Sequence, residues 1–107
     1  MKKLAIYPGS FDPITKGHLD IIKRSVELFQ EFKIGVLINS SKKNWFTIEE
    51  RVNLIKDILK KENLNVEVVS FEGLVVDFMN EQNADILIRG LRAVSDYEYE
   101  LQFTLTN

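Results

Sequence analysis

The chain has 107 residues, of which 45% are apolar and 28% are charged, a balance typical of one globular domain with a single hydrophobic core. A net charge of −2 excludes the broad basic field that drives sequence-independent binding to nucleic acids. The lack of cysteine excludes a disulfide scaffold, and no apolar run approaches the roughly 18 residues of a membrane span. We expect one cytoplasmic domain over residues 1–107, with no nucleic-acid or membrane partner.

Short apolar runs alternate with segments of helical periodicity along the chain. The apolar runs are rich in β-branched residues, which predicts buried parallel strands, and the segments between them carry apolar residues at three- and four-residue spacing. In chain order, we expect strands at 3–7, 33–39, 66–71 and 85–89, each followed by a helix, at 17–30, 47–61, 74–82 and 96–105. This order predicts an α/β fold, a Rossmann-like open parallel sheet with helices on both faces.

The segment 47–61 carries the clearest helical signal. Thr47 is followed by Glu50 three residues later, the spacing of a capping box. An apolar stripe then predicts the buried face of this helix: Ile48, Val52, Ile55, Ile58 and Leu59. In the segment 17–30 the corresponding stripe is Leu19, Ile22, Val26 and Phe29.

Polar and cationic residues concentrate where the predicted strands end. In open parallel sheets, ligands bind outside the carboxyl ends of the strands, which here are followed by loops at 8–17, 40–46, 72–74 and 90–95. The residues of interest in and beside these loops are Ser10, His18, Lys42, Lys43, Arg89 and Arg92. They predict an anion site along one edge of the sheet.

The first of these loops, in "YPGSFDPITKGH", matches neither the Walker pattern nor the dinucleotide fingerprint G-x-G-x-x-G. Its residues nevertheless suit an anion, because Gly9 allows a ligand to approach the backbone and Gly17 opens a helix whose N–H groups favour negative charge. In the first turn of that helix, His18 could donate a hydrogen bond to a phosphate oxygen. Taken alone, His18 favours a capping or half-buried structural role over a ligand-binding one.

Three motifs resemble those of a known family. "TKGH" at 15–18 is similar to the signature of the T/HxGH nucleotidylyltransferase superfamily. Together with "SKKNWFTIEER" and "IRGLRAVSDYEYE", it resembles the pantetheine-phosphate adenylyltransferase family of coenzyme A biosynthesis, with the motifs in the same order and spacing. The resemblance implies transfer of the adenylyl group of ATP to 4′-phosphopantetheine, with Mg²⁺ as cofactor, giving dephospho-coenzyme A and pyrophosphate.

The resemblance also implies roles for individual residues and partners. It assigns contacts with ATP to Ser10, Phe11, His18, Gly90, Leu91, Arg92 and Glu100. It assigns the phosphopantetheine site to Ser10, Lys42, Val75 and Arg89, and catalysis to His18, Lys42 and Arg92. It implies a homohexamer, and coenzyme A as a feedback ligand. No carboxylate cluster in the sequence is typical of a dedicated metal cage, so we expect no protein ligand for the metal.

The sequence departs from the family pattern in three places. Ser10 replaces a threonine and keeps its hydroxyl, and Val75 replaces a larger aliphatic residue. A serine-rich ATP-binding segment is missing, so we expect a chain that is incomplete at its C-terminal side relative to the family. Two alternatives stay open: an inactive nucleotide- or phosphopantetheine-binding module, and a sister transferase with another phosphorylated acceptor.

Two aromatic features have competing interpretations. Trp45 is expected either to cover the acceptor site or to pack on the domain. Tyr97, Tyr99 and Phe103 are expected to form core or subunit contacts rather than ligand contacts.

Overall fold

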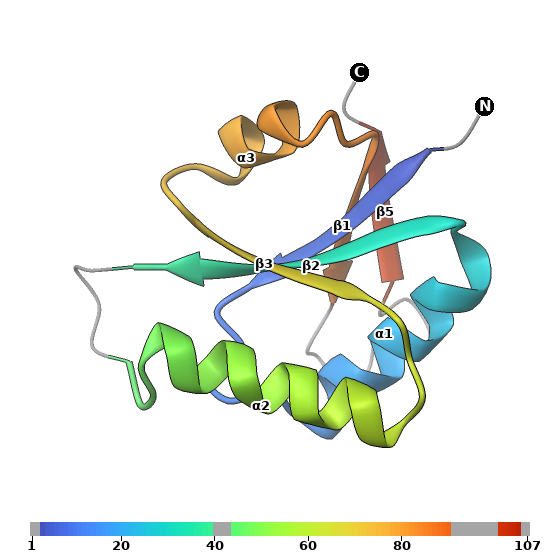
Figure 1. Ribbon diagram of the computed structural model, residues 1–107. Helices are drawn as coiled ribbons and strands as arrows, with labels where there is room; N and C mark the ends of the chain where they lie inside the picture. Colours follow the sequence, from blue (N-terminus) through green and yellow to red (C-terminus); the bar gives the residue numbers. More distant parts are fainter. Residues whose placement is uncertain (1–2, 40–43, 91–100, 106–107) are drawn as a thin grey trace, which may run out of the picture.

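A computed structural model describes residues 3–39, 44–90 and 101–105, and residues 101–105 are described by their backbone only (Figure 1). The described elements are five strands and three helices. In chain order they are β1 (Leu4–Gly9), α1 (Lys16–Leu28), β2 (Glu31–Ile38), α2 (Ile48–Lys61), β3 (Glu67–Glu72), α3 (Val75–Glu81), β4 (Ile86–Gly90) and β5 (Leu101–Leu105). None of the described helices is both long and apolar enough to cross a membrane.

The strands form one sheet in the order β3-β2-β1-β4-β5. The pairs β1–β2, β2–β3 and β1–β4 are parallel, and the first has a continuous register from Leu4↔Glu31 to Gly9↔Val36. The chain therefore moves outward from β1 to β3 and then returns to place β4 on the other side of β1. This makes the gap between the loops after β1 and β4 the topological switch point, the position where such sheets bind ligands.

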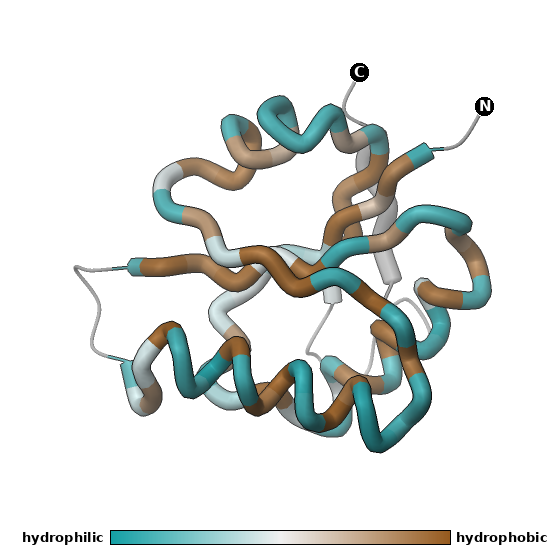
Figure 2. Tube along the Cα trace, in the orientation of Figure 1, coloured by the Kyte–Doolittle hydropathy of each residue, from teal (hydrophilic) through white to brown (hydrophobic). Residues whose placement is uncertain are grey.

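Helices cover both faces of the sheet, which confirms the predicted fold class. α1 and α2 lie below the sheet in Figure 1 and α3 lies above it. Successive residues of β1 point to opposite faces of the sheet. Ala5 and Tyr7 belong to the core between the sheet and helices α1 and α2, and Leu4 and Ile6 belong to the core between the sheet and α3. Figure 2 shows the result as largely brown inner strands. A strand buried on both faces has no polar positions, which is why β1 is an unbroken apolar run.

α2 begins as its sequence predicts. The backbone N–H of Glu50 donates to Thr47 Oγ1 at 3.1 Å, and the N–H of Thr47 donates to Glu50 Oε1 at 2.9 Å. Ile55 and Leu59 are buried on the predicted stripe. In α1 the buried face is centred on Ile21, Ile22 and Ser25, and Leu19 is only half-buried.

The helix expected at 96–105 is wrong over its second half. Leu101–Leu105 is a strand, β5, that pairs antiparallel with β4 in a register that sets Arg89 opposite Gln102. The segment "LQFTL" alternates apolar and polar residues, the period of a half-buried strand, and this signal competes with the helical spacing of the longer segment. Tyr97 and Tyr99 lie outside the described residues, and for Phe103 only the backbone is described.

Gly35 of β2 provides a test of the core beneath α3. A Cβ atom at this position would lie 2.6 Å from Phe78 Cε2 and 3.3 Å from Phe71 Cε1, and these two rings stack with centroids 4.2 Å apart. We expect Gly35→Ala to lower the free energy of unfolding by about 1–3 kcal/mol, because both rings would have to move. Urea denaturation followed by circular dichroism measures this change.

Gly17→Ala is the matched control for this substitution. Its added Cβ would meet only Thr15 Oγ1, at 3.7 Å, on the exposed start of α1. Alanine also favours the helix over glycine, so we expect unchanged or slightly higher stability. Equal stability of Gly35→Ala and wild type would show that the ring stack does not restrict position 35.

Candidate active site

The first loop leaves β1 at the switch point and is anchored by an aromatic ring. Phe11 has a φ of 48° and a side chain that is only 2% exposed. Its ring contacts the ring of Tyr7, with centroids 5.2 Å apart, and the ring of His18, with centroids 4.8 Å apart. Because this ring is buried, any contact of Phe11 with a ligand would involve its backbone. A Cβ on Gly9 would lie 3.2 Å from the Phe11 ring, so glycine there leaves room for the anchor.

His18 is the third residue of α1 and takes part in the N-terminal cap of that helix. The backbone N–H of Thr15 donates to His18 Nδ1 at 2.9 Å, and Thr15 Oγ1 lies 3.1 Å from the same nitrogen. In return, the backbone N–H of His18 donates to Thr15 Oγ1 at 3.2 Å. His18 thus fills the place that Glu or Gln occupies in the common capping box. The structural interpretation of His18 is confirmed.

The cap also determines which ring nitrogen carries the proton. A backbone N–H can only donate, so Nδ1 must accept and cannot be protonated while this bond is present. The proton of the neutral ring is therefore on Nε2. A neutral ring with an N–H on Nε2 is a hydrogen-bond donor, which is the property needed for contact with a phosphate oxygen. The capping role and a ligand-binding role use different nitrogens and are compatible.

The segment that leads into α2 is attached to the first loop by Asp12. The Asp12 carboxylate accepts the backbone N–H of Trp45 at 2.6 Å and that of Phe46 at 2.8 Å. The side chain of Trp45 is 86% exposed, so the expectation that it packs on the domain is wrong. Beside it lies a hollow of about 330 Å³ lined by Ile38, Asn39, Asn44, Trp45, Phe46, Thr47, Ile48, Glu50 and Arg51.

The other described residues of the predicted site lie at or near the ends of β3 and β4. Arg89 is exposed near the end of β4, and Gly90 ends that strand. A Cβ on Gly90 would lie 2.5 Å from Ile21 Cδ1 and 3.1 Å from Tyr7 Oη, so glycine allows β4 to pack closely on α1 and β1. Val75 is half-buried at the first position of α3.

The structure thus brings part of the predicted site together. Ser10 and Phe11 lie in the loop after β1, and His18, in the first turn of α1, contacts the Phe11 ring. Gly90 lies next to this group through its close approach to Tyr7. Val75 belongs to the helix on the opposite face. Five predicted residues lie outside the described part of the chain: Lys42, Lys43, Leu91, Arg92 and Glu100.

Sequence reasoning missed one residue of this region, Arg51. Its side chain is 2% exposed, and its Nη1 donates to the carbonyl oxygen of Ser10 at 2.9 Å. The sequence did contain a signal for Arg51. It lies three residues after Ile48 and four before Ile55, which places it on the buried side of an amphipathic helix. A charged residue at such a position requires polar partners in the interior.

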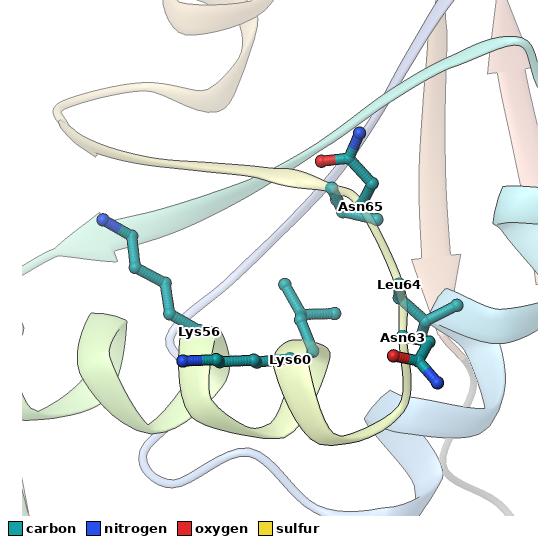
Figure 3. A pocket seen from close by; sticks show the side chains of 7 residues that line it. Lys56, Lys60, Asn63, Leu64 and Asn65 are labelled. Atoms are coloured by element: carbon teal, nitrogen blue, oxygen red, sulfur yellow. The ribbon is translucent and has the colours of Figure 1, made fainter.

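A second hollow, of about 340 Å³, lies at the opposite end of the sheet from the candidate site, where the parallel strands begin. It is lined by Lys56, Leu59, Lys60, Asn63, Leu64, Asn65 and Val66, from the end of α2 and the segment leading into β3. Figure 3 shows the two lysine side chains and that of Asn65 extending in different directions. This hollow faces the amino end of β3 and is not part of the candidate site.

The fold is that of an open-sheet α/β domain, a class of protein that binds ligands at the carboxyl ends of its strands. Comparison with known proteins identifies the class more closely. The model of the cytidylyltransferase-like family matches residues 6–107, and the chain belongs to that family.

The chain is also similar to curated bacterial enzymes named phosphopantetheine adenylyltransferase. It is 58% identical to that of Clostridium botulinum over 105 residues, which is 98% of this chain and 65% of the relative. Identity to that of Clostridium tetani is 57% over 104 residues, or 97% of this chain and 64% of the relative. For Lachnoclostridium phytofermentans the identity is 57% over 105 residues, or 98% and 64%. The chain thus spans just under two thirds of the length of these relatives.

The proton position on His18 can be tested directly, because the chain contains one histidine. We expect nitrogen-15 NMR of the imidazole at neutral pH to show the tautomer protonated on Nε2, since Nδ1 accepts the Thr15 N–H. Thr15→Val is the control: it removes the hydroxyl but keeps the backbone donor, so the tautomer should persist. A ring protonated on Nδ1 in the wild-type chain would contradict the capping geometry.

Proposed function

We propose that the protein of which this chain is part transfers the adenylyl group of ATP to 4′-phosphopantetheine, forming dephospho-coenzyme A and pyrophosphate. The observation that carries the proposal is the 58% identity to a phosphopantetheine adenylyltransferase over 98% of the chain. The position of Ser10 and His18 at the switch point supports it, because that is where an open parallel sheet binds a nucleotide.

In this reaction an oxygen of the acceptor phosphate attacks the α-phosphorus of ATP as the bond from that phosphorus to the bridging oxygen of pyrophosphate breaks. The attacking phosphate is already ionised, so the step does not depend on a general base. The main barrier is the repulsion between two anions, together with the charge that builds on the α-phosphoryl oxygens. The protein's contribution is therefore to hold the two phosphates in line and to supply hydrogen-bond donors and positive charge.

Each residue of the site has a role that follows from its position in the fold. His18 would donate from Nε2 to an α-phosphoryl oxygen, a bond that strengthens as charge develops. Ser10 would contact both the nucleotide and the acceptor phosphate from the loop after β1. Lys42 and Arg89 would hold the acceptor phosphate, and Arg92 the phosphates of ATP, with the arginine fork suited to two oxygens at once.

The remaining residues would bind the two substrates without taking part in catalysis. The backbone of Phe11 and residues Gly90, Leu91 and Glu100 would complete the ATP site, and Val75 would line the phosphopantetheine site. The exposed Trp45 stands beside the hollow at the end of β2, where it could cover the acceptor.

Mg²⁺ is the expected cofactor. Within the described ranges, no group of three or more His, Cys, Asp or Glu side chains could hold a metal ion. These residues do not fit a dedicated metal cage, so the ion would be bound mainly by phosphate oxygens. When bound there, Mg²⁺ would neutralise phosphate charge.

The resemblance to the family supports three further parts of the proposal. The complete protein would act in the cytoplasm, where coenzyme A is made, and would assemble as a homohexamer. Coenzyme A, which contains both halves of the reaction product, would bind the same site as a feedback ligand.

The proposal predicts binding that depends on the acceptor phosphate. We expect calorimetric titration of the chain with 4′-phosphopantetheine to give binding, and titration with pantetheine, which lacks the phosphate, to give much weaker binding. Nicotinamide mononucleotide serves as the rival acceptor. Absence of binding by the folded chain would overturn the proposal, and a preference for nicotinamide mononucleotide would assign a sister transferase instead.

The catalytic role of His18 has its own test in the complete protein. We expect His18→Ala to slow pyrophosphate release from ATP, Mg²⁺ and phosphopantetheine by about 10²- to 10³-fold, the usual effect of removing one donor to a developing oxyanion. Because the substitution also removes part of the α1 cap, stability is measured in parallel. A folded variant with the wild-type rate would exclude His18 from the chemistry.

A further inference from the structure

Arg51 is a buried cation directly behind the candidate site. It is the fourth residue of α2, and its guanidinium lies beneath the loop that carries Ser10. Nη1 donates to the carbonyl oxygen of Ser10 at 2.9 Å and to that of Leu37 at 3.0 Å, and Nε lies 3.4 Å from the carbonyl oxygen of Thr47. One side chain thus connects the loop after β1, the end of β2 and the start of α2.

The partners of this guanidinium are neutral. Arg51 makes no ion pair with any carboxylate of the described chain, and its acceptors are backbone carbonyl oxygens. A buried charge is costly unless it is paired, and breaking its hydrogen bonds would increase the cost. The carbonyls satisfy the donors but leave a full positive charge in the interior, where solvent screens it little.

Asp12 adds a second connection between the same segments. Its carboxylate accepts the N–H groups of Trp45 and Phe46, next to the Thr47 carbonyl that Arg51 contacts. The first loop is therefore held from both sides against the segment that enters α2. In the sequence, Lys42 lies two residues before the described part of this segment.

We propose that Arg51 is a positioning residue for phosphate recognition: it fixes the Ser10 loop against the segment that follows Lys42, and its buried charge strengthens binding of the acceptor phosphate. This inference rests on the proposed function, because it concerns the same anion site. It assigns a role to a residue that is too deeply buried to serve as a surface cation. The positive charge and the placement of Nε and Nη1 on one planar group both contribute.

The variants Arg51→Met and Arg51→Lys separate charge from geometry. Methionine removes the charge at similar length. Lysine keeps the charge but has one donor nitrogen, so it cannot contact the Thr47 carbonyl through Nε while its end group reaches the carbonyls of Ser10 and Leu37. Lys56→Met is the matched control, because it removes one positive charge from the same helix at the hollow at the opposite end of the sheet. Each chain is titrated with 4′-phosphopantetheine and with pantetheine.

We expect Arg51→Met to bind 4′-phosphopantetheine about tenfold more weakly, with a much smaller effect on pantetheine. Arg51→Lys should recover part of the loss, and Lys56→Met should bind as wild type does. An unchanged ratio of the two affinities in a folded Arg51→Met chain would overturn the inference alone. A wild-type chain that binds neither compound would overturn the proposed function and the inference with it.

A measurement on the wild-type chain covers the case in which Arg51→Met does not fold. The Nε–H of a buried arginine exchanges slowly enough for NMR, and Arg51→Lys assigns its signal by removing it. We expect this signal to shift when 4′-phosphopantetheine binds and to stay in place with pantetheine. No shift with the bound phosphorylated compound would overturn the inference.

Discussion

The architecture depends on the burial of β1 against cores on both faces of the sheet. This strand has a parallel neighbour on each side, and its alternate residues enter cores on both faces, so that Ala5 and Ile6 are both inaccessible to solvent. No part of such a strand can meet a ligand except its end. The chain that leaves β1 at Gly9 emerges between the crossovers to β2 and β4, and the loop that carries Ser10 and leads to His18 begins there. Burial of one strand thus determines where the site can be.

Local signals in the sequence were sufficient for most of the described elements. β1 to β4 are short apolar runs. Thr47 and Glu50, followed by an apolar stripe, predict the start and the buried face of α2, and the structure confirms both. β5 was missed because "LQFTL" satisfies two periods at once, and the choice between them depends on pairing with β4, which lies outside the segment itself. A local pattern cannot decide a question that a non-local partner settles.

The site shows the same division between local and non-local information. The cap between Thr15 and His18 spans three residues, and a reader of "TKGH" could have found it by allowing histidine at the position of Glu or Gln in a capping box. The contacts of Arg51 with Ser10 and Leu37 span 41 and 14 residues, and their acceptors are backbone carbonyls, which every residue has. Nothing in the identity of Ser10 or Leu37 marks it as a partner for an arginine.

The net charge of −2 raises the question of how this protein would attract ligands as negative as ATP and a phosphate monoester. Exposed cations such as Arg89 act over short distances, since salt screens surface charges beyond about 8 Å at physiological ionic strength. The charge of Arg51 lies in the interior and is not screened in this way, and no described carboxylate forms an ion pair with it. A chain with a net negative charge can therefore present a locally positive site, provided that one cation is buried behind the loop and its donors are satisfied by carbonyls.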